Sequence, residues 1–275
     1  EELQSFITTA RTDHNLNVQL APYIDPDFDN PLNSGRGSIG EGYGEAEWDA
    51  FFDSYTNDFI LPHAKVAEAA GAEWFCVGAE LATAFRQNDR WPPLIEAVRK
   101  VYSGKLIAAI NYGQAIALPP IPWLELLDGI GVECYVSLST PIPKFGRPTL
   151  SDLLQAWTTP TMAMEKLSNA TGKGIMCTEV GYQSRFNTTR TPASTNMSDP
   201  FSTLGRVALN VDLDSQALAY QALLQSLYPK PWFLGVHWWL WQADGSASGT
   251  SDTEFSPKGK PASTSVLQRW YRWYS

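Results

Sequence analysis

The chain has 275 residues, 44% of them hydrophobic and 18% charged, with a formal net charge of −9. This composition excludes an intrinsically disordered chain, and 29 acidic against 20 basic residues leave no basic footprint for nucleic acid. The sequence also lacks a run of 18 apolar residues that could span a membrane. Its unusual feature is aromatic, because 11 residues are tryptophan.

Short apolar runs alternate along the chain with longer segments of helical periodicity. The runs predict strands at Val18–Ile24, Glu73–Val77, Lys105–Ile110, Gly129–Tyr135, Gly174–Thr178 and Leu234–Trp241. The longer segments predict helices at Glu47–Ala70, Pro92–Tyr102, Pro122–Leu127, Thr149–Asn169, Ser215–Tyr228 and Ser263–Tyr274. Strands that are apolar along their whole length and alternate with helices indicate an α/β fold with a parallel sheet covered on both faces.

Open doubly wound sheets and closed (β/α)8 barrels both satisfy this alternation. The nucleotide-binding fingerprints of the open class, G-x-G-x-x-G and the Walker sequence, are missing, so a TIM-type barrel is favoured. Two polar stretches rich in Gly, Pro and Ser, Asp25–Gly44 and Gln183–Asp214, each follow a predicted strand directly. Barrel enzymes carry their long active-site loops at this position. We therefore expect a single catalytic barrel domain over residues 1–275.

Two glutamates stand out from the acidic residues on predicted helix surfaces. Glu80 follows the second predicted strand and Glu179 follows the fifth, so both lie at the carboxyl end of an apolar strand. This edge carries the chemistry of barrel enzymes, and a carboxylate there is costly to bury without a partner or a function. The position of each glutamate alone is equally compatible with a buried, hydrogen-bonded acid, but two on strands of one sheet favour a catalytic pair.

Glycoside hydrolysis requires two carboxyl groups, one to protonate the departing oxygen and one to act as nucleophile or base. Tryptophan side chains fit the same chemistry, because the apolar faces of sugar rings pack against indole. Most of the tryptophans are expected to fill the core. Trp239 and Trp241, at the end of the last predicted strand, are expected to stack against sugar instead.

Several motifs, in chain order, resemble clan A glycoside hydrolases and most closely glycoside hydrolase family 113, whose characterised members are β-mannanases. Three of them follow predicted strands, namely Gly78–Leu81, Thr178–Tyr182 and Gly235–Trp241. Further similarities lie in Leu20–Asp25, Gly35–Gly37, the aromatic helix around Trp48 and Tyr55, Asp128–Gly131 with Tyr135, and Ser256–Pro261.

The resemblance implies a retaining mechanism through a covalent glycosyl-enzyme. Glu80 would be the general acid/base at the end of the fourth barrel strand, and Glu179 the nucleophile at the end of the seventh. Tyr135 would hold the nucleophile. The sugar subsites would be lined by Arg36, Asn111, Trp239 and Trp241.

The sequence departs from the clan in two places. Much of the clan has Asn before the acid/base, where this chain has Ala79, so the identity of the sugar stays open. By the resemblance, Val18–Ile24 is the third barrel strand, preceded by a helix at Glu1–His14. The first two βα units would then lie upstream of Glu1 or be absent, and any targeting segment would have been removed or lie upstream.

The expected substrate is a β-linked polysaccharide, with β-1,4-mannan or glucomannan as the favoured choice. Chitosan, xylan, β-glucan and a non-catalytic carbohydrate-binding barrel are the alternatives. We expect a monomer without cofactor. No metal is expected either, because the three histidines are scattered and the cysteines fit no zinc motif. Cys76, Cys134 and Cys177 are expected to be buried thiols. N-glycosylation patterns at Asn169, Asn187 and Asn196, barely more than chance would give, lead us to expect an extracellular or secretory-pathway location.

Overall fold

A computed structural model describes residues 1–25, 35–117, 119–138, 147–193, 211–242 and 248–272. Parts of the two predicted long loops, the glycosylation pattern at Asn196 and the last residues of the predicted C-terminal helix lie outside these ranges. The chain divides into two compact units. The first unit comprises residues 1–132 and 167–175, and the second comprises residues 133–166 and 176–275.

The strands form one sheet whose order follows the chain, β1-β2-β3-β4-β5-β6. They are β1 (Gln19–Leu20), β2 (Trp74–Ala79), β3 (Lys105–Asn111), β4 (Gly129–Glu133), β5 (Gly174–Val180) and β6 (Phe233–Trp238). The pairing is parallel from β1 to β2, with Gln19 opposite Trp74, and from β2 to β3, with Trp74 opposite Lys105. An open doubly wound sheet reverses its strand order at a switch point. The sequential order therefore favours the barrel over the open doubly wound sheet. The described part of the chain contributes six strands.

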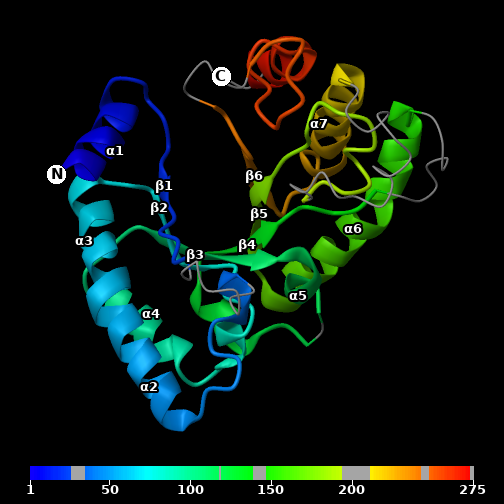
Figure 1. The fold of residues 1–275 in the computed structure, drawn as a ribbon. Coiled ribbons are helices and arrows are strands. Elements are labelled where there is room, and N and C mark those ends of the chain that lie inside the picture. The colour runs from blue at the N-terminus through cyan, green and yellow to red at the C-terminus, as the bar shows by residue number, and fades with distance from the viewer. Residues whose placement is uncertain (26–34, 118, 139–146, 194–210, 243–247, 273–275) are drawn as a thin grey trace. The chain divides into compact units, whose positions relative to one another are not determined.

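The helices lie close to their predicted places, except for the short α5, which was not predicted (Figure 1). In chain order they are α1 (Glu2–Thr12), α2 (Glu45–Ser54), α3 (Leu61–Ala70), α4 (Trp91–Arg99), α5 (Tyr112–Ala115), α6 (Leu150–Thr171), α7 (Leu213–Leu227) and α8 (Gln268–Arg272). A π-helical segment, Tyr55–Ile60, joins α2 to α3, so the predicted helix at Glu47–Ala70 forms as one rod (Figure 1). Pro62 follows this segment. The wider π turn gives its ring room that a regular α-helix lacks.

The first strand is much shorter than predicted. The prediction gave Val18–Ile24, but only Gln19 and Leu20 pair with β2. Pro22 has no N–H to donate to a ladder, and β1 stands at the end of the strand order, so it has one neighbour among the described strands. The last strand also ends early, at Trp238 rather than Trp241. The segment predicted as a helix at Pro122–Leu127 is a 3-10 turn over Pro122–Leu126.

The prediction that all three cysteines are thiols is wrong for two of them. Cys134 and Cys177 form a disulfide with a Cα–Cα distance of 5.6 Å. Cys134 follows β4 and Cys177 lies in β5, so neighbouring strands place the two side chains next to each other. Cys76 remains a buried thiol whose Sγ lies 3.2 Å from the carbonyl oxygen of Gly78.

In the described ranges, no helix combines the length and the apolar character that crossing a membrane requires.

Candidate active site

Glu80 directly follows β2 in the first unit and has a half-buried side chain. Its backbone lies in the left-handed region, with φ of 56°, which is rare for a residue with a side chain. The conformation is fixed from both sides: the Glu80 N–H donates to Ala109 O over 2.9 Å, and the Ala82 N–H donates to Glu80 O over 2.9 Å. Such backbone strain is concentrated at functional sites.

Arg36 contacts Glu80 directly. It begins a 3-10 turn, Arg36–Ser38, and its Nη1 lies 3.0 Å from Glu80 Oε2. The same guanidinium donates through Nε to Asp25 Oδ1 over 3.0 Å and also pairs with Asp25 through Nη2. Its Cζ lies 4.6 Å from the ring centroid of Tyr23. Arg36, predicted to line a sugar subsite, is thus part of a charged cluster in which Asp25 balances the guanidinium beside Glu80.

Two buried tryptophans support the turn that follows Glu80. The rings of Trp91 and Trp123 stack at 4.7 Å, and both side chains are at most 2% exposed. Their indole N–H groups donate to Ala84 O over 2.8 Å and to Phe85 O over 3.1 Å. These two tryptophans therefore fill the core and, at the same time, hold the backbone four and five residues beyond Glu80.

Asn111 ends β3, the strand next to the one that leads to Glu80. It lies two residues beyond Ala109, which accepts the hydrogen bond from Glu80 N, and its side chain is half-buried. The two residues therefore share the carboxyl edge of β2 and β3. A contact of Asn111 with sugar stays a prediction.

In the second unit, Glu179 is the penultimate residue of β5 and has a half-buried side chain. Its carbonyl oxygen accepts a hydrogen bond of 2.7 Å from the N–H of Cys134. Tyr135 is the next residue along that segment and is half-buried, so it lies on the chain beside the strand that carries Glu179. On the preceding residue, the Thr178 hydroxyl donates to Glu133 Oε1 over 3.1 Å.

The tryptophans at the end of β6 divide into two groups. Trp238 is half-buried and packs against α7, with its ring stacked on Tyr220 at 4.0 Å. Trp239 and Trp241 are 42% and 54% exposed, in contrast to the buried tryptophans of the core. The Trp239 N–H donates to Val180 O over 2.7 Å, which brings the end of β6 to the residue after Glu179. The peptide bond between Trp239 and Leu240 is cis.

Sequence reasoning missed two features of these sites. It did not predict Asp25 as the partner of Arg36, although Asp25 ends one of the motifs of the family resemblance. It also missed the disulfide beside Glu179, for which the signal was a cysteine near the end of each of two consecutive predicted strands. In the ranges that the structure describes, no group of three or more His, Cys, Asp or Glu side chains could hold a metal ion.

The family model of Glycoside Hydrolase Family 113 matches residues 1–260. No curated protein matches the chain. Among solved structures, the β-mannanase AaManA from Alicyclobacillus acidocaldarius in complex with ManMIm is similar over 98% of this chain and 77% of its own, with 24% identity and a TM-score of 0.74.

Two structures of GH113 β-1,4-mannanase are similar as well. The first, a complex, is 24% identical, covers 98% of this chain and 78% of its own, and has a TM-score of 0.78. The second is 22% identical over the same shares, with a TM-score of 0.70. These likenesses confirm the TIM-type barrel fold. Because the family model matches almost the whole sequence, the chain belongs to Glycoside Hydrolase Family 113 and is a glycoside hydrolase.

Proposed function

We propose that this protein is a retaining glycoside hydrolase that cleaves β-1,4-linked mannan or glucomannan. The observation that carries the proposal is the position of Glu80 and Glu179, each at the carboxyl end of a buried strand in a chain of this family. The similar solved structures are named as β-mannanases, which supports mannan as the substrate.

In this mechanism the Glu179 carboxylate attacks the anomeric carbon while Glu80 protonates the departing glycosidic oxygen. The glycosyl-enzyme ester is then hydrolysed by water, from which Glu80 removes a proton. Arg36 holds one oxygen of Glu80, so the carboxyl group keeps one orientation through both steps. Asp25 offsets the guanidinium charge beside the acid.

The exposed rings of Trp239 and Trp241 are available for stacking on pyranose faces, and we propose them as sugar-binding residues. We also propose polar sugar-binding residues, namely Arg36, Asn111 and Tyr135. Asn111 ends β3, Tyr135 lies two residues beyond β4, and Arg36 contacts Glu80 from the loop after β1.

We further propose an extracellular or secretory-pathway location. The Cys134–Cys177 disulfide supports it, because disulfides persist in oxidising compartments and are rare in the cytosol. The glycosylation pattern at Asn169 lies at an exposed residue, which fits the same location.

The test is reducing-end release from mannan, glucomannan, chitosan, xylan and β-glucan by the wild type, Glu179→Ala and Glu80→Ala. Glu179→Ala should abolish turnover. Glu80→Ala should lose about 10²–10⁴-fold on polysaccharide but keep cleaving an aryl β-mannoside whose leaving group needs no proton. Glu96→Ala, which removes an exposed acid from α4, is the matched control and should keep full activity.

Full activity in both active-site variants would refute these roles. A wild type that binds polysaccharide on a column but releases no reducing ends would replace the hydrolase with a carbohydrate-binding protein. Hydrolysis of another glycan in place of mannan would correct the substrate alone.

A further inference from the structure

The segment that follows Glu179 is attached along its length to the segments that follow β6. Val180 O accepts from Trp239 N, and the Cα of Gly181 packs so closely on Trp239 O that a Cβ would lie 1.8 Å from that oxygen. Further along, the Ser184 N–H donates to Glu254 O over 3.3 Å and the Ser184 hydroxyl donates to Asp252 O over 2.6 Å. Residues 252–254 therefore border the chain that leaves Glu179.

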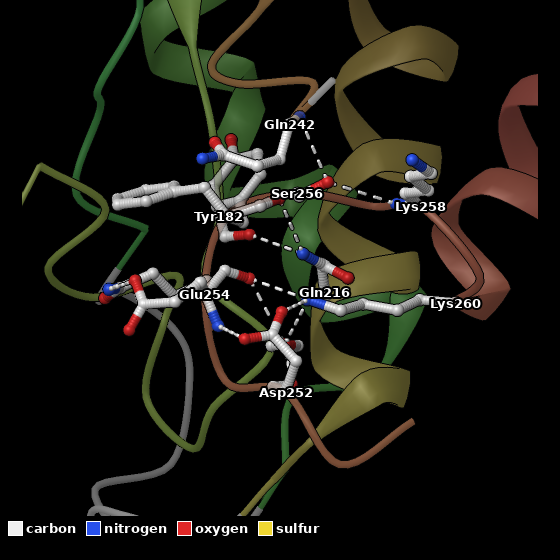
Figure 2. A network of polar contacts seen from close by, with 11 residues as sticks. Tyr182, Gln216, Gln242, Asp252, Glu254, Ser256, Lys258 and Lys260 are labelled. Carbon is white, nitrogen blue, oxygen red and sulfur yellow. Dashed lines mark hydrogen bonds and ion pairs between the residues drawn. The ribbon is translucent and has the colours of Figure 1, made fainter. Parts of the chain in front are cut away.

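A fully buried lysine closes this junction (Figure 2). The side chain of Lys260 is 0% exposed, and its Nζ lies 2.5 Å from Asp252 Oδ2. The ammonium also donates to Ser184 Oγ and to Glu254 O, each over 2.9 Å. One side chain thus contacts the segment beyond Glu179 and two residues of the loop beyond β6. We refer to Lys260, Asp252 and Ser184 as the lysine clasp.

Helix α7 is hydrogen-bonded to the same two segments. The Gln216 side chain is fully buried, and its Nε2 donates to Tyr182 O over 2.8 Å and to Phe255 O over 3.1 Å (Figure 2). At the far end of the loop, the Gln242 N–H donates to Ser256 Oγ over 3.3 Å, next to Trp241. Residues 252–256 are therefore hydrogen-bonded both to the residue after Trp241 and to the segment beyond Glu179.

Stability alone is a poor reason for a lysine in this place. Taking an ammonium and a carboxylate out of water carries a desolvation penalty that their attraction often does no more than offset, and well-packed apolar residues would serve equally well. Burial accordingly lowers the pKa of Lys260, although Asp252 acts in the opposite direction. A buried ammonium that donates to three fixed acceptors does, however, hold the segments that carry these acceptors in a single geometry.

We propose that Lys260 is a positioning residue: through the lysine clasp it sets the backbone that carries Glu179 and Trp239. The inference rests on the roles of these two residues under the proposed function. A displacement of about 1 Å at a reacting group can cost about 100-fold in rate, so a clasp that touches neither substrate nor carboxylate can still control turnover.

The test variant is Lys260→Met/Asp252→Asn, which removes both charges and so leaves neither partner buried alone. The substrate is 2,4-dinitrophenyl β-mannobioside, whose leaving group needs no proton, so that kcat/KM for its cleavage reports the attack by Glu179. We expect kcat/KM to fall about 10- to 100-fold. Hydrogen exchange at the amides of Ser184 and Trp239 should accelerate, while the amides of β2 and β3 stay protected.

Leu223→Ala serves as the stability control. Leu223 is a fully buried residue of α7, and its truncation should destabilise the second unit by about 2–5 kcal/mol without touching the clasp. Assayed well below its melting temperature, Leu223→Ala should keep the kcat/KM of the wild type. If both variants lower Tm and neither changes kcat/KM or the exchange of the two amides, Lys260 is only structural and the inference is wrong.

The exchange measurement needs no substrate, so failure of the inference can be separated from failure of the proposed function. A wild type that cleaves no β-mannoside overturns the function. An active wild type with unchanged exchange at Ser184 and Trp239 in the double variant overturns the clasp. Should the double variant fail to fold, Ser184→Ala, which removes one acceptor of the ammonium and leaves the ion pair intact, applies the same two readouts.

Discussion

Gly181, two residues beyond Glu179, occupies a position that no other residue can take without movement of its neighbours. A Cβ there would lie 1.8 Å from Trp239 O and 3.0 Å from Phe255 Cδ1. The first contact is with backbone, which cannot turn aside as a side-chain end could. The glycine therefore permits the close approach of the β6 end to the chain beyond Glu179.

Gly181→Ala should lower both activity and stability, because the added methyl forces Trp239 and its backbone away. Overpacking of this kind costs about 1–3 kcal/mol, and we expect kcat/KM to fall by about 10-fold or more. Polysaccharide kinetics and thermal unfolding measure the two effects. The matched control is Gly113→Ala, where nothing lies within 4 Å of the added Cβ and both properties should stay unchanged. Wild-type values for Gly181→Ala would show that the backbone contact is unimportant.

At the scale of elements, the first unit uses carboxylates to hold the beginnings of its strands. Glu73 precedes β2, accepts a 2.7 Å hydrogen bond from Val18 N just before β1, and pairs with Arg11 of α1 at 2.8 Å. Asp128 precedes β4 in the same way and accepts a 2.7 Å bond from Leu106 N of β3. In both cases, a carboxylate just before one strand accepts a hydrogen bond from a backbone N–H at the start of the neighbouring strand.

The ties formed by Glu73 predict a loss of stability in acid. Burial alone would raise the pKa of Glu73, but the hydrogen bond from Val18 N and the contacts with Arg11 more than offset it and hold the pKa below its usual value. A carboxyl group whose pKa is lower in the folded state contributes stability above its unfolded pKa, near pH 4, and loses it as pH falls through the folded value.

Glu73→Gln should therefore lower the free energy of unfolding by about 1–2 kcal/mol at pH 7 and make little difference below about pH 3. The measurement is chemical denaturation at several pH values from about 2.5 to 7, which is roughly the range over which carboxyl groups titrate. Glu125→Gln, which changes an exposed acid in the same unit, should parallel the wild type at every pH. An equal loss for Glu73→Gln at pH 7 and at pH 2.5 would contradict the role of its charge.

At the scale of the whole molecule, strand order could be predicted because it follows from the alternation of strands and helices. The sites of Glu80 and Glu179 could be predicted for the same reason: a strand end is visible in sequence as the point where an apolar run stops. The lysine clasp could not be predicted, because lysine is almost always at the surface. The burial of Lys260 depends on Ser184 and Glu254, which are 76 and 6 residues away in the chain.

The disulfide also depends on which strands are neighbours in the folded sheet. An odd number of cysteines with no regular spacing indicates buried thiols, yet neighbouring strands bring Cys134 beside Cys177. The bond joins two residues of the second unit that are 43 residues apart in the sequence. Closing a loop of that length stabilises a domain by about 4 kcal/mol in the chain-entropy account, by restricting the unfolded state.

We therefore expect one thiol, that of Cys76, to react with a maleimide when the protein is unfolded without reductant, and three to react after reduction. Reduction, or Cys134→Ala/Cys177→Ala, should lower the melting temperature by several degrees because the unfolded second unit gains conformational freedom. Cys76→Ala separates the two effects, since it removes the reactive thiol but leaves the disulfide, so no thiol should react before reduction. Three reactive thiols in the unreduced protein would refute the disulfide and remove the main support for an oxidising compartment.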